Sequence, residues 1–303
     1  MGEGPEVVAR AAPGSFLQVV PGPHQLRSLT AGWRCQGHTV GLVPTMGALH
    51  AGHLSLVRAA RRDCSRVLVS VFVNPLQFGS SEDFERYPRQ LDADLARLRE
   101  IAVDACYCPT AELLYPPEFA SQVTVEAAGD LWEVRARPGH FAGVATLVTK
   151  LFAATGPCRA YFGEKDAQQV AVVSRLALDL DLGVEVVVCP IVRDPDGLAL
   201  SSRNTLLSEQ GRRAALCLSR GISLARRRFA EGEDSGPELA RLVAEVVGAE
   251  PYARLDYAGV VDPGDFSPVM RAQAESRVLV AAAVEGVRLI DTGVLAPGGG
   301  SGG

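Results

Sequence analysis

The chain has 303 residues, of which 47% are hydrophobic and 21% charged, as is usual for a globular protein with a sizeable core. Thirty Lys and Arg against 35 Asp and Glu leave a net charge of −5, which argues against binding to nucleic acid or to a membrane surface. The longest apolar run, Val67–Val73, is interrupted by Ser70 and is too short to span a bilayer.

The N-terminal residues and the cysteines both indicate a reducing compartment. The N-terminus has neither the charged start nor the apolar stretch of a secretory signal, so we expect a cytoplasmic protein. The seven cysteines include no C-x-x-C pair and have mostly apolar neighbours, which predicts buried, reduced thiols. They stand at positions 35, 64, 106, 108, 158, 189 and 217.

Up to about residue 190 the sequence alternates between strand and helix patterns. Residues 1–23 are rich in Gly, Pro and Ala and predict a loose lead-in. Strands are predicted at 39–43, 66–73, 104–108, 160–162 and 184–188. Helices are predicted at 53–62, 143–154 and 168–182. A further helix is predicted around Leu91, Leu95 and Leu98, whose spacing would form its core stripe. This alternation predicts an α/β fold with a Rossmann-like, doubly wound parallel sheet.

After Pro190 the alternation stops. Helices are predicted at 209–230 and 237–247, followed by strands at 255–261, 277–283 and 287–290. We therefore expect residues 1–191 to form the Rossmann-like domain and residues 192–296 a second, smaller α+β C-terminal domain. The glycine-rich residues 297–303 predict a disordered tail.

The first chemically informative segment follows the first predicted strand, where Pro44-Thr45-Met46-Gly47-Ala48-Leu49-His50-Ala51-Gly52-His53 turns into a helix. Parallel sheets bind ligands at the carboxyl ends of their strands, and a helix N-terminus attracts phosphate. Gly47 and Gly52 allow close backbone approach, and His50 and His53 can both donate hydrogen bonds to a phosphate whose charge grows in the transition state. The segment predicts a phosphate-transfer site, and the alternative is that the two histidines only cap the helix. No P-loop and no G-x-G-x-x-G signature is present.

Two later segments could complete a phosphate site. Gly163-Glu164-Lys165-Asp166 ends a predicted strand, where Lys165 could neutralise phosphate and Asp166 could hold Mg²⁺. The alternative is an Asp N-cap beside a solvated Lys. The hydroxyls and guanidinium of Leu200-Ser201-Ser202-Arg203 form a plausible phosphate clamp, although a helix start would explain the serines equally well.

Neutral amides suggest the second substrate. Asn74 and Gln77 follow the predicted buried strand, and Gln169 stands at the start of a later helix, where it could face the same cavity. Amides suit the hydroxyl or carboxylate of a small polar acceptor, whereas a phosphorylated acceptor would require Arg or Lys.

From about Gly41 to Asp291 the chain resembles the pantothenate synthetase family, also called pantoate–β-alanine ligase. The resemblance rests on VPTMGALHAGH, VSVFVNPLQF, RPGHFAGVATLVTKLF, YFGEKDAQQ, PIVRDPDGLALSSRN and RLID, in the family's order and spacing. The H-x-G-H motif alone would indicate only the wider nucleotidylyl-transfer superfamily. The resemblance implies a Rossmann-like domain with a smaller domain that closes over the site, in a cytoplasmic homodimer.

The resemblance also implies a reaction in two steps. Pantoate attacks the α-phosphate of ATP, with Mg²⁺ present, to give pantoyl adenylate and pyrophosphate. The amine of β-alanine then attacks the adenylate to give pantothenate and AMP.

Residue roles follow by matching motif. His53 would be the proton donor, with His50 beside it on the phosphates, Lys165 on phosphate and Asp166 near Mg²⁺. Gln77 and Gln169 would hold pantoate, and Asn74 would be a supporting amide. Val192 would touch adenine, while Arg137 and His140 would lie near the site. The implied ATP-binding set is Met46, Gly47, Ala48, Leu49, His50, Ala51, Gly52, His53, Gly163, Glu164, Lys165, Asp166, Val192, Leu200, Ser201, Ser202 and Arg203.

Departures from the family pattern are few. Ala167 stands where relatives often carry a bulkier residue, and Leu200 replaces the commoner Met, a swap that conserves volume. Two other functions compete with the ligase: an adenylyltransferase acting on a phosphorylated coenzyme precursor, and a nucleotide-binding protein without catalysis. The neutral amides disfavour the first, and the joint presence of His50, His53, Lys165 and Arg203 disfavours the second.

Overall fold

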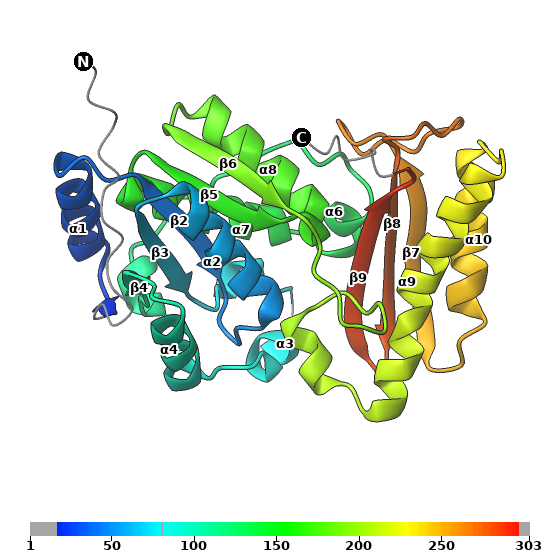
Figure 1. Cartoon of the computed structure of the whole chain (residues 1–303), viewed down its shortest axis with the longest axis horizontal. Coiled ribbons are helices and arrows are strands. Elements are labelled where there is room, and N and C mark those ends of the chain that lie inside the picture. The colour runs from blue at the N-terminus through cyan, green and yellow to red at the C-terminus, as the bar shows by residue number, and fades with distance from the viewer. Residues whose placement is uncertain (1–16, 80, 297–303) are drawn as a thin grey trace, which may run out of the picture.

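The computed structural model describes residues 17–79 and 81–296, without the side chains of residues 81–83. Within them, six parallel strands form one sheet in the order β1-β4-β3-β2-β5-β6, and three antiparallel strands form a second in the order β7-β8-β9 (Figure 1). The strands are β1 Gln18–Val20, β2 Val40–Thr45, β3 Arg66–Val71, β4 Ala105–Tyr107, β5 Cys158–Gly163, β6 Val184–Cys189, β7 Ala253–Val261, β8 Arg277–Val284 and β9 Val287–Val294. The α-helices are α1 Pro23–Cys35, α2 Ala51–Asp63, α3 Ser81–Arg86, α4 Leu91–Glu100, α5 Ala111–Leu114, α6 Glu133–Ala136, α7 His140–Thr155, α8 Ala167–Asp179, α9 Glu209–Ala230 and α10 Gly236–Gly248, and the 3-10 turns are η1 Pro75–Gln77, η2 Glu164–Asp166 and η3 Ser202–Leu206.

Helices cover both faces of the parallel sheet because alternate strand residues point to opposite sides. On β3, Val67 and Val69 pack with residues of α2 and α4. Leu68, between them, packs with residues of α1, α7 and α8 on the other face. The predicted doubly wound parallel sheet is confirmed.

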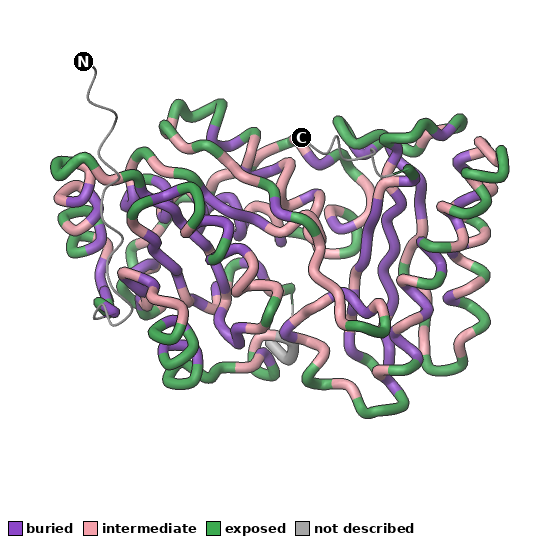
Figure 2. Tube along the Cα trace, viewed as in Figure 1, coloured by how far each residue is buried: buried purple, intermediate pink, exposed green. Residues whose placement is uncertain are grey.

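The C-terminal sheet packs on two sides. Val278 and Val280 of β8 belong to one core with residues of α9 and α10, whereas Leu279 faces the other way and packs with Phe266. Figure 2 shows the buried strands of both sheets with largely exposed helix surfaces outside them. The predicted smaller α+β unit is therefore present as a three-stranded antiparallel sheet with two long helices.

Some sequence expectations fail. The loose lead-in was predicted to reach residue 23, but β1 pairs with β4 in the sheet, and Pro23 already begins α1. Leu91 does not belong to the core stripe of α4, since it is 43% exposed, while Leu95 and Leu98 are buried. Residues 1–16 of the lead-in and the predicted tail 297–303 lie outside the described residues.

The cysteines match the prediction of free thiols, although not all of them are buried. All seven are unpaired, and Cys35 at the end of α1 is exposed. Cys106 of β4 and Cys108, which directly follows this strand, have their sulfur atoms 3.1 Å apart. No helix in the described ranges, 17–79 and 81–296, is long and apolar enough to cross a membrane.

Candidate active site

The loops that follow β2, β3, β5 and β6 leave the same edge of the parallel sheet and enclose one cavity of about 220 Å³. All four predicted segments contribute to its wall. The predicted residues that line it are Met46, His50, Gly52, His53, Gln77, Gly163, Lys165, Asp166, Gln169, Val192, Leu200, Ser201, Ser202 and Arg203. The predicted residues Gly47, Ala48, Leu49, Ala51, Asn74 and Glu164 are not part of this lining.

The histidine pair both caps a helix and faces the cavity. His50 is the N-cap of α2, and its Nδ1 accepts a hydrogen bond from the Gly52 N–H at 3.1 Å. The Nδ1 of His53 accepts in turn from the His50 N–H at 3.4 Å. The capping role that was left open is thus real and compatible with chemistry, because each ring keeps Nε2–H as its donor.

Burial keeps both imidazoles neutral. Desolvation, followed by the charge of Lys165, lowers the pKa of His50 from 6.5 to about 4. Desolvation and the neighbouring His50 lower the pKa of His53 from 6.5 to about 3. Near neutral pH the pair therefore offers uncharged N–H donors, and an anion bound between them would draw both pKa values upward.

Lys165 and Asp166 form a charged pair at the cavity wall. The Nζ of Lys165 lies 3.2 Å from Oδ1 of Asp166. Burial alone would raise the pKa of Asp166, but the positive charges of Lys165 and Arg203 hold it below its usual value. Asp166 occupies the N-cap position of α8 without a side-chain capping bond, so its carboxylate is held by Lys165 and not by the helix end.

The serine–arginine segment reaches the cavity from the C-terminal side of the molecule. The Oγ of Ser202 donates to the carbonyl oxygen of Ala48 at 3.2 Å, which ties this segment to the loop after β2. Ser201 is the N-cap of η3 and accepts from the Arg203 N–H. The helix-start alternative is therefore also correct for Ser201, while Arg203 faces the cavity and its guanidinium lies over the ring of Tyr87.

Of the two amides after β3, Gln77 lines the cavity and Asn74 holds Gln77 in place from within the protein. Asn74 is fully buried and donates to Gln77 Oε1 and to the carbonyl oxygen of Gly143. Its own Oδ1 accepts from the Leu76 N–H and the Tyr115 hydroxyl, so all its hydrogen-bonding groups are engaged inside the protein. Gln77 lines the cavity with its Nε2 2.8 Å from the sulfur of Met46. The sequence grouped Asn74 with the substrate-binding amides, whereas the structure gives it the supporting position that the resemblance implied.

The resemblance placed Arg137 and His140 near the site without giving them roles. In the structure both side chains bind the backbone of Gln77. The Nδ1 of His140 donates to the Gln77 carbonyl oxygen at 2.8 Å, and a guanidinium N–H of Arg137 donates to the same oxygen at 3.2 Å. Burial, followed by the charge of Arg137, lowers the pKa of His140 from 6.5 to about 4. Both residues also line the cavity.

Sequence reasoning missed part of the cavity wall. An apolar stripe of α7 and two aromatic side chains face the cavity: Val144, Leu147, Val148, Leu151, Phe72 and Tyr87. Their helical or strand spacing looks the same as ordinary core packing, so only the three-dimensional arrangement separates them from the core.

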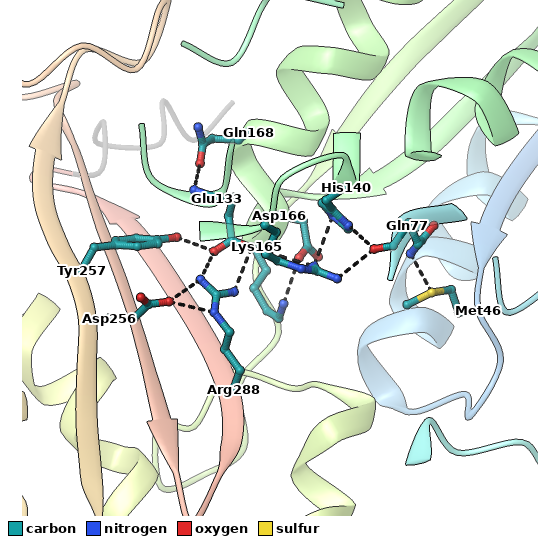
Figure 3. A network of polar contacts seen from close by, with 11 residues as sticks. Met46, Gln77, Glu133, His140, Lys165, Asp166, Gln168, Asp256, Tyr257 and Arg288 are labelled. Carbon is teal, nitrogen blue, oxygen red and sulfur yellow. Dashed lines mark hydrogen bonds and ion pairs between the residues drawn. The ribbon is translucent and has the colours of Figure 1, made fainter. Parts of the chain in front are cut away.

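A chain of polar contacts links this site to the C-terminal sheet (Figure 3). Both oxygens of the buried Glu133 accept from the guanidinium of Arg288 on β9, and the Tyr257 hydroxyl donates to Glu133 at 2.8 Å. Arg137 lies 3.9 Å from Glu133 and also contacts His140. The support of Gln77 is thereby continuous with the strands of the second sheet.

Comparison with known proteins gives one consistent result. The family model described as pantoate-beta-alanine ligase matches residues 18–294. A pantothenate synthetase of Rubrobacter xylanophilus is 51% identical over 281 residues, which cover 90% of this chain and 97% of that protein. A crystal structure of pantothenate synthetase from Thermus thermophilus matches with a TM-score of 0.87 and 45% identity, over 93% of this chain and 100% of that one. A pantoate-beta-alanine ligase from Francisella tularensis, complexed with beta-gamma ATP and beta-alanine, matches with a TM-score of 0.74 and 32% identity, over 93% of this chain and 99% of that chain.

Proposed function

The chain belongs to the pantoate–β-alanine ligase family, and from this premise we propose how its cavity carries out the reaction and which residues take part. The protein is an amide-forming ligase that joins pantoate to β-alanine at the expense of ATP. The observation that supports the assignment of roles is the placement of phosphate-binding groups and a neutral amide in one cavity. His50, His53, Lys165 and Arg203 line it together with Gln77.

The first step is the adenylation of pantoate. A carboxylate oxygen of pantoate attacks the α-phosphorus of ATP, a new P–O bond forms, and the bond to the pyrophosphate oxygen breaks. Negative charge grows on the phosphate oxygens, and the Nε2–H groups of His50 and His53, with Lys165, stabilise it. Once the bound phosphates have raised its pKa and it has taken up a proton, His53 donates that proton to the oxygen of the departing pyrophosphate.

The second step is attack by the amine of β-alanine on the carbonyl carbon of the adenylate. The C–N bond forms, the C–O bond to AMP breaks, and the proton lost by the amine passes to the phosphate of the departing AMP or to water. Gln77 and Gln169 hold pantoate from two sides of the cavity through both steps, and Asn74 keeps Gln77 in place. The apolar stripe of α7 contacts the methyl groups of pantoate and keeps water from the activated carbonyl.

Adenylyl transfer to a phosphorylated acceptor is not favoured. Arg137 is the cationic side chain beside Gln77, but its guanidinium donates to the Gln77 carbonyl oxygen and pairs with Glu133. The acceptor end of the cavity is therefore supplied with an amide and apolar groups, which suit the hydroxyls, methyl groups and carboxylate of pantoate.

We propose that Mg²⁺ enters with the nucleotide. Within the residues that the structure describes, no three His, Cys, Asp or Glu side chains gather into a metal site. The carboxylate of Asp166, kept ionised by Lys165 and Arg203, would hold the ion together with the phosphates of ATP, an arrangement that magnesium prefers. When bound, the ion neutralises part of the triphosphate charge.

We propose a division into an N-terminal domain up to residue 191 and a C-terminal domain of residues 192–296 that moves to admit the substrates. Support comes from Arg193, whose guanidinium pairs with Asp291 of β9 and so attaches the segment after β6 to the second sheet. The cavity is lined by residues of both parts, Met46 to Gln169 in the first and Val192 to Arg203 in the second, so a movement of the second part would change its opening.

We further propose a cytoplasmic homodimer. The edge strand β6 and the end of α8 expose Val188, Leu178 and Leu180, with Leu178 71% exposed. Apolar side chains beside an unpaired strand edge favour association with a second copy. Sedimentation equilibrium tests this proposal: a mass of one chain at micromolar concentration would contradict it.

The roles are tested by omitting one substrate at a time. With ATP, Mg²⁺ and pantoate, the enzyme should release pyrophosphate and accumulate pantoyl adenylate, and AMP with pantothenate should follow only when β-alanine is added. Pyrophosphate release that does not depend on pantoate, or that a phosphorylated acceptor drives equally well, would overturn the proposal.

A further inference from the structure

The loop that carries the histidine pair has an unfavourable backbone conformation. Gly47 and Ala48 both have positive φ values, 82° and 48°, and only the first is a glycine. An alanine in the left-handed region costs free energy unless surrounding contacts hold it there. Something outside the loop must therefore fix the path from Thr45 to His50.

Asp94 on α4 supplies those contacts. One carboxylate oxygen, Oδ2, accepts from the Ala48 N–H at 2.8 Å, and the other, Oδ1, accepts from the Leu49 N–H at 2.8 Å. Asp94 is fully buried, 46 and 45 residues away from its two partners in the sequence. A β-carbon added to Gly47 would lie 3.1 Å from Oδ2, so the carboxylate also closes the inner side of the loop.

Two further side chains donate hydrogen bonds to carbonyl oxygens of the same loop. Arg97, one turn along α4 from Asp94, donates to the carbonyl oxygen of Leu49. Ser202 donates to the carbonyl oxygen of Ala48 from the other side. The N–H groups of Ala48 and Leu49 thus point to Asp94 and not to a phosphate.

We propose that Asp94 is a positioning residue for the adenylation step: its carboxylate sets the conformation of the Gly47–Leu49 turn and so the placement of His50 and His53. The proposal rests on the function proposed above. It places the larger effect on the nucleotide half of the site, because Gln77 belongs to η1 and Gln169 to α8, and Gln77 meets this loop at Met46, before the Gly47–Leu49 turn.

The test is the variant Asp94→Asn, which keeps the shape of the side chain but turns its NH₂ group toward a backbone N–H. A displacement of about 1 Å at reacting groups can cost on the order of 10²-fold in rate. We expect the rate of pantoyl adenylate formation to fall by roughly that factor and the KM for ATP to rise, while pantoate binding, measured by direct titration, weakens by a much smaller factor.

Asp104→Asn is the matched control. Asp104 is also a nearly buried carboxylate that accepts from a backbone N–H, that of Val67 at 2.8 Å, and it pairs with Arg66. It lies before β4, at the opposite end of the sheet from the cavity. We expect Asp104→Asn to lose thermal stability but to keep the ATP and pantoate parameters of the wild type.

Arg97→Gln provides a second variant that changes an exposed side chain, so it should not disturb the protein core. It should show a smaller decrease in the rate of adenylate formation and a smaller increase in the KM for ATP than Asp94→Asn.

The proposal is overturned if folded Asp94→Asn forms the adenylate at the wild-type rate, or if ATP and pantoate parameters worsen equally in both α4 variants. A wild-type enzyme that releases no pyrophosphate with pantoate would instead refute the proposed function.

Discussion

At the scale of single residues, the proposed adenylation depends on two imidazoles, His50 and His53, that are neutral because they are buried. We expect His50→Ala and His53→Ala each to lower the rate of adenylation by about 10²–10³, since each removes one donor to the developing phosphate charge. Quenched-flow measurement of pantoyl adenylate checks this. His38→Ala is the control, because His38 contacts Ser65 and Arg66 at the amino end of the sheet.

If His50→Ala or His53→Ala formed pantoyl adenylate at the wild-type rate, the histidine replaced would not take part in the adenylation step. Circular dichroism and thermal melting of each variant show whether a loss reflects unfolding.

The same burial makes the stability depend on pH. Above pH 6.5 the imidazoles are neutral in both the folded and unfolded chain. As the pH falls below 6.5, these three histidines become protonated in the unfolded chain. In the folded chain they stay neutral until about pH 4 for His50 and His140 and about pH 3 for His53. The free energy of unfolding should therefore decrease between pH 6.5 and pH 5, by up to ~1.4 kcal/mol per pH unit for each histidine.

Urea unfolding at a series of pH values measures this slope. His53→Gln should flatten it, because the substituted side chain does not titrate. Equal slopes for wild type and His53→Gln between pH 5 and 6.5 would contradict the buried neutral state.

The sequence predicts the residues whose signal lies in one contiguous segment. His50, His53, Lys165 and Arg203 each stand in a short motif at a strand end, where parallel sheets bind ligands, and all four line the cavity. Asp94 could not be found in this way. It looks like a helical surface acid, and its partners are 45 and 46 residues away.

At the scale of elements, the contact between α7 and η1 places Gln77. A β-carbon on Gly143 would clash with the carbonyl oxygen of Leu76 and lie 2.7 Å from the Gln77 nitrogen, both backbone atoms that cannot turn aside. Gly143→Ala should therefore push η1 away from α7 and weaken pantoate binding by about tenfold or more, the loss of one hydrogen bond to a charged group.

Isothermal titration with pantoate measures the effect, and Gly32→Ala serves as control. Gly32 also lies within a helix, but a β-carbon there meets nothing within 4 Å. Unchanged pantoate affinity in folded Gly143→Ala would show that this close approach does not position the amide.

Element prediction succeeded where hydrophobic periodicity was strong, and the predicted 209–230 helix coincides with α9. It failed for α1, whose buried face consists of Leu26, Thr30 and Trp33 and so includes a polar residue. It also failed for β1, which has three residues and is held by pairing with β4, a contact that no local pattern reveals.

At the scale of the whole molecule, half-buried ionic contacts join the C-terminal sheet to α6 and η2, which pack beside the parallel sheet. Arg288 of β9 binds Glu133 through two nitrogens, and Arg277 of β8 pairs with Glu164 at 2.6 Å. Gly259 of β7 leaves room for the ring of Trp132, since a β-carbon there would clash with it. These pairs join residues more than 100 positions apart, so the sequence alone could not show them.

If the C-terminal part moves as proposed, the Glu133–Arg288 contact favours the closed form. We expect Arg288→Gln to increase the radius of gyration in small-angle scattering and to raise the concentration of a non-hydrolysable ATP analogue needed for compaction, because Glu133 loses its bidentate partner. Arg159→Gln is the control: its ion pair with Glu185 joins β5 and β6 within one sheet. Scattering identical to wild type in Arg288→Gln would contradict the coupling.

The central claim is that one cavity activates pantoate by transferring AMP to its carboxylate. The most direct measurement uses pantoate labelled with ¹⁸O in the carboxylate, together with ATP, Mg²⁺ and β-alanine, followed by mass spectrometry of the products. Because the pantoate oxygen forms the P–O bond and the amine later breaks the C–O bond, one ¹⁸O should appear in AMP and none in pyrophosphate. Label in pyrophosphate or inorganic phosphate, or AMP without label, would contradict the account.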